Sequence, residues 1–237
     1  MENKTKAVWI TGASSGIGKA LAYEFVKNGK TVIGTARRFE LLNSIKSELG
    51  ESGRLFIPVK LDITNYSESE NFYKLIAEDY QIECLINNAG VTSFKLAEED
   101  SIEEIKEIIE VNLLGSIYAI KCVLADMKIN KAGTIINILS AVTQKVFTNS
   151  SSYSAAKSGL MAYAKVLREE LRGDNIRVIN ISPGATVTPI WPEKVTQKKS
   201  DKMMRPERIA SFVYKAFAEE SNMVPEEIVL RPSTGDL

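Results

Sequence analysis

A tyrosine and a lysine four residues apart, in the stretch YSAAK from Tyr153 to Lys157, are the residues of this chain best suited to moving protons. The chain contains no histidine, so no Ser-His-Asp triad can form and the usual proton carrier near neutral pH is missing. A general acid must then be a carboxyl, a lysine, a tyrosine or a cysteine. On a helix, a spacing of four residues places Tyr153 and Lys157 on one face, about one turn apart.

Such a pair has a definite chemical use, although alone on a helix it is more often structural. A free tyrosine titrates at about pH 10, which is too high for efficient proton exchange at neutrality. A neighbouring ammonium stabilises the tyrosinate, so we expect Lys157 to lower the pKa of Tyr153. Ser140, at the end of an apolar run, is a second candidate: it either caps a turn or donates a hydrogen bond to an oxygen that develops negative charge.

A glycine-rich loop, TGASSGIG, follows the first apolar run at residues 11–18. Gly12, Gly16 and Gly18 remove three β-carbons, so that a backbone there can approach a pyrophosphate at a helix N-terminus. The spacing G-x-x-x-G-x-G differs from the G-x-G-x-x-G of the common dinucleotide fingerprint. A tight strand-to-helix turn without a ligand is the alternative.

The residues that select the adenosine ribose are expected about twenty positions further on. NAD sites commonly place an acidic residue there, whereas here Ala36 occupies that position and Arg37 and Arg38 follow it. A guanidinium grips a phosphate with two parallel hydrogen bonds. The pattern favours NADP(H) over NAD(H); the alternative is that both arginines are solvated residues at a helix start.

Short apolar runs alternate with amphipathic stretches along the whole chain. The runs are rich in Val and Ile and apolar throughout, which is typical of parallel strands covered on both faces. They lie at 6–11, 31–36, 55–61, 84–89, 134–139, 176–182 and 226–232, and helices are predicted at 17–28, 40–49, 67–80, 102–128, 152–172 and 206–220. The alternation predicts an α/β fold, a Rossmann-like doubly wound parallel sheet with helices on both faces.

The length and composition set the class of protein. A chain of 237 residues suits one large domain, 1–237, and the irregular stretch 185–205 is predicted to be a substrate lid within it. The 30 basic residues balance the 30 acidic ones, so nothing favours nucleic acid or a membrane surface. Cys84 and Cys122 lie in apolar surroundings and are expected to be reduced. With no export signal or membrane run, we expect a cytoplasmic protein.

Six motifs occur together in one order: TGASSGIG (11–18), NNAG (87–90), Asn112, Ser140, YSAAK (153–157) and PGATVT (183–188). In combination and spacing they resemble the short-chain dehydrogenase/reductase family over nearly the whole chain. The resemblance implies a seven-stranded parallel sheet, a nicotinamide cofactor and assembly as a homodimer or homotetramer through the helices at 102–129 and 151–172. The short tail STGDL departs from the glycine-rich tail of many members, so that interface is expected to differ.

The resemblance also assigns roles residue by residue. Tyr153, Lys157, Ser140 and Asn112 match the catalytic residues, with Asn112 holding a water that links Lys157 to solvent; the alternative is that Asn112 satisfies a neighbouring backbone group. The implied cofactor residues are Gly12, Ser14, Ser15, Gly16, Ile17, Gly18, Arg37, Arg38, Asp62, Ile63, Asn88, Ala89, Gly90, Tyr153, Lys157, Pro183, Gly184, Thr186 and Thr188. No metal ligands are predicted.

These observations predict an NADP(H)-dependent oxidoreductase that acts on a carbonyl or secondary alcohol. Phe94, Phe147, Trp191, Met203 and Met204 are candidates for the substrate pocket or for ordinary packing. Lys194, Lys198 and Lys199 in the lid either favour an acidic substrate or keep a loop soluble. The rival hypotheses are a non-catalytic NADPH-binding regulator on the same scaffold and an epimerase or dehydratase that uses a bound nucleotide.

Overall fold

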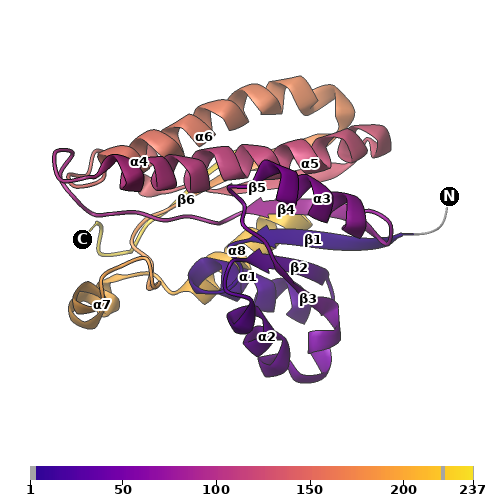
Figure 1. Cartoon of the computed structure of the whole chain (residues 1–237), viewed down its shortest axis with the longest axis horizontal. Coiled ribbons are helices and arrows are strands. Elements are labelled where there is room, and N and C mark those ends of the chain that lie inside the picture. The colour runs from indigo at the N-terminus through magenta and orange to yellow at the C-terminus, as the bar shows by residue number, and fades with distance from the viewer. Residues whose placement is uncertain (1–3, 220–221, 237) are drawn as a thin grey trace.

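Seven strands pair in parallel into one sheet, which confirms the predicted fold class (Figure 1). The computed structural model describes residues 4–219 and 222–236. The strands are β1 (Thr5–Thr11), β2 (Thr31–Ala36), β3 (Phe56–Lys60), β4 (Tyr80–Asn87), β5 (Gly133–Ile138), β6 (Ile176–Pro183) and β7 (Glu227–Leu230), in the order β3-β2-β1-β4-β5-β6-β7. The extent of the predicted domain, 1–237, stays a prediction, because 1–3, 220–221 and 237 lie outside the described residues.

Helices cover both faces of the sheet (Figure 1). One face packs against α1 (Gly16–Lys27), α2 (Phe39–Glu48) and α8 (Pro206–Ala218), and the other against α3 (Tyr66–Ile76), α5 (Gly115–Asn130) and α6 (Ser151–Leu171). Because β1 pairs with β2 on one side and β4 on the other, the winding reverses at β1. In open α/β sheets this reversal leaves a crevice outside the carboxyl ends of the strands, where ligands bind.

Burial on both faces explains why the strands are apolar throughout. In β1, Val8 and Ile10 belong to the core beneath α1 and α8, whereas Ala7 and Trp9 belong to the core beneath α3, α5 and α6. The Trp9 indole is fully buried, and its Nε1 donates to Thr35 Oγ1 on β2 at 3.0 Å. The polar edge of the largest core side chain is thereby satisfied. Cys84 and Cys122 are buried and unpaired.

The helix predicted at 102–128 is interrupted. It consists of α4 (Ile102–Ile109), one π-helical turn, η2 (Glu110–Leu114), and α5. A side-chain amide at position 112 donates to the Ile108 carbonyl at 2.9 Å and competes with the α-helical ladder. Residues 102–130 are long and apolar enough, by composition alone, to cross a membrane. The apolar side of α5, including Ile120 and Val123, is buried against the sheet.

Several further boundaries differ from the sequence expectations. The strand β4 begins at Tyr80 rather than at 84, because Tyr80–Ile82 continue the pairing with β1, and the helix predicted at 67–80 ends at Ile76 as α3. The stretch 185–205 is not irregular throughout, since it contains α7 (Glu193–Lys199) and the short turn η5 (Ser200–Lys202). The last predicted helix ends at Ala218, and its predicted final residue, 220, lies outside the described residues. The remaining short turns are η1 (Gly50–Leu55), η3 (Ala141–Thr143) and η4 (Arg172–Asp174).

A chain of amide side chains crosses the sheet from β4 to β7. Asn87 donates to Asn137 at 3.0 Å, Asn137 donates to Asn180 at 3.0 Å, and Asn180 donates to Glu227 at 3.0 Å. Each pair lies in register on adjacent strands. The three asparagines are at most 1% exposed. Because a buried amide is costly unless it is hydrogen-bonded, the chain favours one register for the strand ends that meet the crevice.

The amide chain should depend on its central member. Asn137→Ala leaves buried polar atoms on both neighbours without partners, so we expect the free energy of unfolding to fall by about 3 kcal/mol. Urea denaturation measures the change. The control is Asn130→Ala, which removes an exposed amide that donates to the Asp126 carbonyl and should change stability by about 0.5 kcal/mol or less. Equal effects of the two substitutions would contradict the account of the chain.

Candidate active site

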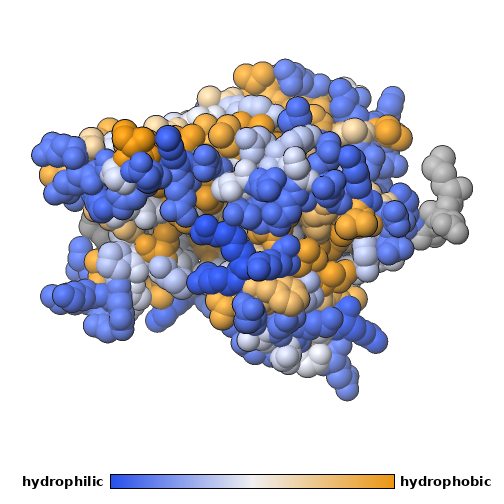
Figure 2. Space-filling view, in the orientation of Figure 1, coloured by the Kyte–Doolittle hydropathy of each residue, from blue (hydrophilic) through white to orange (hydrophobic). Residues whose placement is uncertain are grey.

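A cleft of about 870 Å³ lies at the carboxyl ends of the strands, at the predicted crevice. It is bounded by the loops after β1, β2, β4, β5 and β6, and in Figure 2 the surface is hollowed between the part that carries α4 and the part that carries α7. The volume lies in the range of ligand clefts, roughly 300–1,000 Å³. The predicted site residues that line it are Gly12, Ser14, Ser15, Gly16, Ile17, Arg37, Arg38, Asp62, Ile63, Asn88, Ala89, Gly90, Ser140, Tyr153, Lys157, Pro183, Gly184, Thr186 and Thr188.

Two predicted site residues, Gly18 and Asn112, do not line the cleft. A β-carbon on Gly18 would lie 2.3 Å from the Gly12 carbonyl oxygen, so this glycine lets α1 pack against its own loop. Gly12 itself has φ +65° and a β-carbon there would lie 2.7 Å from Ala89 Cα. Both positions therefore require glycine for close backbone packing.

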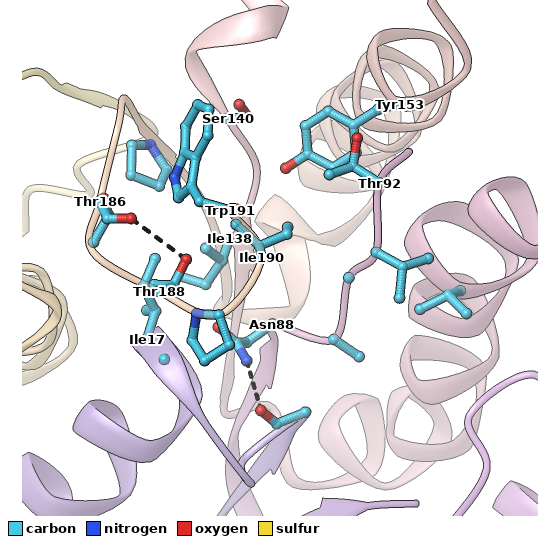
Figure 3. A pocket seen from close by; sticks show the side chains of 18 of the residues that line it. Ile17, Asn88, Thr92, Ile138, Ser140, Tyr153, Thr186, Thr188, Ile190 and Trp191 are labelled. Carbon is cyan, nitrogen blue, oxygen red and sulfur yellow. Dashed lines mark hydrogen bonds between the residues drawn. The ribbon is translucent and has the colours of Figure 1, made fainter. Parts of the chain in front are cut away.

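The loop after β4 is tied to the glycine loop by Thr11, a residue that the sequence reasoning missed. Thr11 Oγ1 accepts hydrogen bonds from the backbone N–H groups of Asn88 at 3.0 Å and Ala89 at 3.1 Å. The Asn88 side chain donates in return to the carbonyls of Thr11 at 3.0 Å and Gly12 at 3.1 Å. Figure 3 shows Asn88 turned toward this loop. A hydroxyl at the last strand position before the first glycine was the signal available in the sequence.

The two arginines after β2 diverge. Arg38 Nη2 donates to Ser14 Oγ at 3.1 Å and to Ser15 Oγ at 2.9 Å, so its guanidinium lies against the glycine loop. Arg37 lies 3.4 Å from a carboxylate oxygen of Glu107 on α4, and both side chains are more than half exposed. Ser15 makes no side-chain cap of α1. The loop thus presents helix amides, two hydroxyls and a cation on one wall of the cleft, which suits an anion.

Asp62, which also lines the cleft, is held by its own turn. Its Oδ1 accepts from the Thr64 N–H at 3.0 Å and from Thr64 Oγ1 at 2.8 Å. Ile63 beside it is 8% exposed and contributes an apolar surface. The structure therefore brings Asp62 and Ile63 to the cleft, as predicted.

Lys157 lies on the floor of the cleft with 3% of its surface exposed. Its Nζ donates to the Ile138 carbonyl oxygen at 2.9 Å and lies 5.8 Å from the centre of the Tyr153 ring. Burial disfavours the charged form, which lowers the pKa of Lys157 to about 8. The ammonium is therefore still protonated at neutral pH and releases its proton more easily than a surface lysine.

Tyr153 projects from α6 into the cleft (Figure 3). We expected a lowered pKa for Tyr153, and the net shift is in the opposite direction: burial, the larger effect, raises the pKa of Tyr153 to about 12, and the Ser140 side chain acts against it. The phenol is fully protonated at neutral pH. Ser140 lies on the same side of the cleft and begins η3, where its Oγ accepts from the Val142 N–H at 3.4 Å.

Asn112 lies in the π-helical turn, behind Gly90, and is 0% exposed. Its Nδ2 donates to the carbonyls of Val91 at 2.8 Å and Ile108 at 2.9 Å. Its Oδ1 is buried and has no partner among the described residues. A β-carbon on Gly90 would lie 2.7 Å from this oxygen and 3.6 Å from Lys157 Nζ, so the two polar atoms flank one point at the cleft floor.

An aromatic pair closes one side of the cleft. The rings of Phe94 and Trp191 stack with centroids 4.7 Å apart and planes 20° apart, which joins the loop after β4 to the loop after β6. Phe94 has φ +54°, an uncommon conformation for a bulky residue. Phe147 also lines the cleft, whereas Met203 and Met204 do not; Met204 packs against the core beneath α1 and α8.

The base of the 185–205 segment is fixed to the body of the cleft. Thr186 forms a parallel bridge with Met204, supported by hydrogen bonds between Val187 N–H and the Met204 carbonyl and between Met204 N–H and the Ala185 carbonyl, both at 2.9 Å. Thr188 Oγ1 donates to the Thr186 carbonyl at 3.4 Å, and both threonines face the cleft in Figure 3. The segment is therefore a closed loop that carries α7.

Comparison with known proteins identifies the family. The short chain dehydrogenase family model matches residues 6–199, and the chain belongs to this family of oxidoreductases. It is 33% identical to sepiapterin reductase of Chlorobaculum tepidum, over 96% of each chain.

Two solved structures show the same fold. An alcohol dehydrogenase of Thermococcus sibiricus, complexed with 5-hydroxy-NADP, is 29% identical with a TM-score of 0.86 over 97% of each chain. The closed form of a serine dehydrogenase complexed with NADP+ is 27% identical with a TM-score of 0.90, over 98% of this chain and 96% of that one.

Proposed function

We propose that this protein is an NADP(H)-dependent oxidoreductase that interconverts a carbonyl compound and a secondary alcohol, with Tyr153 as the proton donor and acceptor. The observation that carries the proposal is the buried ammonium of Lys157 beneath the Tyr153 ring, at the floor of a cleft whose other end suits an anion. The NADP-bound relatives support the choice of cofactor.

The residues on the cleft wall fit NADP(H). The glycine loop and the open N-terminus of α1 would bind the pyrophosphate, and Arg38 with Ser14 and Ser15 would bind the 2′-phosphate, with Arg37 at its edge. Asp62 and Ile63 would contact the adenine, and the nicotinamide end would lie near Thr188 and Lys157. When bound, NADP(H) supplies or accepts the hydride.

The protein's own residues would handle the proton. The Tyr153 hydroxyl donates its proton to the oxygen of the reduced carbonyl, and the Ser140 hydroxyl donates a hydrogen bond to the same oxygen. Lys157, whose pKa of about 8 is close to the ambient pH, then returns a proton to the phenolate. Since a pKa of about 12 makes Tyr153 a poor acid by itself, the adjacent ammonium is needed to stabilise the phenolate as it forms.

Asn112 is proposed to hold a water molecule next to Lys157. Its unpartnered Oδ1 and the Lys157 ammonium flank one point beside Gly90, and a buried acceptor ordinarily has a protein or water partner. A water held there would accept from Lys157 and connect it to solvent.

We also propose that the chain assembles as a homo-oligomer, because exposed apolar residues such as Ile102, Ile129 and Val166 remain on α4, α5 and α6. A cytoplasmic location stays a prediction from the sequence.

The role of Tyr153 predicts a clean loss of turnover. Tyr153→Phe removes the donated proton but keeps the ring, so kcat should fall by about 100-fold or more while the Kd for NADPH changes by about twofold or less. The assay follows NADPH absorbance across a panel of carbonyl compounds, with NADH in parallel.

The matched control is Tyr163→Phe, nearly three helical turns further along α6, which should leave turnover unchanged. Turnover retained by Tyr153→Phe would remove that residue from the mechanism. NADPH binding without turnover of any compound in the panel would favour the non-catalytic regulator.

The position of Arg38 predicts how the cofactor is selected. Arg38→Ala should raise KM for NADPH by about tenfold or more and leave KM for NADH nearly unchanged, because a charge-assisted pair contributes about 1.5–3 kcal/mol. Arg37→Ala should have a smaller effect, since that guanidinium is exposed and shared with Glu107. A larger effect at Arg37 would assign the main phosphate contact to that residue instead.

A further inference from the structure

A carboxylate of the chain's own C-terminal segment lies in the cleft, held by two cations. Asp236 lines the cleft, and its side chain is only 10% exposed. Its Oδ2 lies 3.0 Å from Lys145 Nζ and forms a second ion pair with Arg231. The two cations come from separate parts of the chain, one after η3 and the other after β7, and converge on one carboxylate.

Asp236 lines the cleft, whereas its two partners, Lys145 and Arg231, do not line it themselves. Lys145 follows η3, the turn whose N-cap is Ser140, and its backbone N–H donates to the Ala141 carbonyl at 3.0 Å. Its Nζ also lies 5.6 Å from the ring centre of Phe147, which lines the cleft. Among the described residues that line the cleft, Asp236 and Asp62 are the two carboxylates, and Asp62 is the one proposed to contact the adenine.

The ion pairs that hold Asp236 are weak enough for another carboxylate to take its place. The side chains of Lys145 and Arg231 are 56% and 36% exposed, and ion pairs at such exposure contribute roughly 0–1 kcal/mol. Replacing Asp236 by another carboxylate keeps both cations paired, so the exchange costs little beyond moving the terminal segment. Of the three lysines on α7, Lys199 lines the cleft and adds a further positive charge, whereas Lys194 and Lys198 do not line it.

We propose that Lys145 and Arg231 form an anion subsite that binds a carboxylate of the substrate, and that Asp236 occupies this subsite until the substrate displaces it. The proposal rests on the proposed function and narrows its substrate class to oxo acids and the corresponding hydroxy acids. Asp236 is then an internal competitor of the substrate, and a neutral carbonyl compound gains nothing from the two cations.

The test compares 2-, 3- and 4-oxo acids with their methyl esters, which differ in the charge and keep the reacting carbonyl. For the best acid, the ratio of kcat/KM for acid to kcat/KM for ester should fall about threefold in Lys145→Gln and about fivefold in Arg231→Gln. The ratio should rise about threefold in Asp236→Asn, because the competitor is gone. Lys194→Gln, which removes an exposed charge on α7 and leaves both partners of Asp236 in place, should leave the ratio unchanged.

A second measurement does not need turnover. Calorimetric titration of 3-hydroxybutanoate into the NADPH complex, which cannot react in this state of reduction, should show tighter binding to Asp236→Asn and weaker binding to Arg231→Gln than to the natural chain. Here the change in Kd should be about three- to fivefold.

The outcomes separate the two levels of the proposal. If acids and esters are both reduced but the acid-to-ester ratio of kcat/KM is the same in all variants, the proposed anion subsite is wrong and the proposed function stands. If Asp236→Asn slows acid and ester alike and lowers the melting temperature, Asp236 is a structural tie for the terminal segment and the subsite is also wrong. If neither acids nor esters nor any neutral carbonyl compound consume NADPH, the proposed function fails and the substrate class fails with it.

Discussion

A single ammonium group, Lys157 Nζ, lies in the protein interior at the floor of the cleft. Such burial is unfavourable for a charge, and one backbone carbonyl, that of Ile138, is its hydrogen-bond partner among the described residues. This cost of burying the charge lowers the pKa of Lys157 to about 8. A lysine that is charged at neutral pH and yet gives up its proton readily is uncommon, and groups so perturbed occur at functional sites.

The surrounding elements define the position of this ammonium. The end of β5 contributes the Ile138 carbonyl and then Ser140, while α6 contributes the lysine and Tyr153 on one face. The π-helical turn brings the Asn112 amide behind Gly90, where only a glycine leaves room. The amide chain from Asn87 to Glu227 fixes the register of the four strands whose ends form this part of the cleft.

Much of this arrangement follows from the sequence, because its causes are local. Continuous apolar runs predicted all seven strands, and the spacing of Tyr153 and Lys157 predicted their shared helix face. The glycine loop lies between β1 and α1 and lines the cleft, as its position between an apolar run and a helical pattern predicted. Gly18 was expected at the cofactor but packs beneath the loop, a distinction that depends on which way each glycine faces.

The features that could not be predicted depend on contacts between distant segments. The π-helical turn arises from hydrogen bonds of Asn112 to Val91 and Ile108, and no pattern within residues 102–128 signals it. Arg37 and Arg38 are equivalent in sequence, and the structure distinguishes them only through Glu107 and the glycine-loop serines. The pKa of Tyr153 was expected to fall because charge was considered without burial, and burial is the larger effect.

The central claim is that Lys157 is buried as an ammonium with a weakened hold on its proton, and stability as a function of pH tests it most directly. An unfolded lysine releases its proton at about pH 10.5, whereas the folded one does so at about pH 8. Between these values the unfolded state binds more protons, so stability rises with pH. The raised pKa of Tyr153 acts in the opposite direction only above about pH 10.

Urea denaturation of the natural chain and of Lys157→Met, from pH 7 to pH 10, isolates this contribution, because all other ionisable groups are shared. The account predicts that the free energy of unfolding of the natural chain gains on that of Lys157→Met steadily from about pH 8 upward. Parallel curves over that range would contradict it, since they would mean that Lys157 titrates as it does in the unfolded chain.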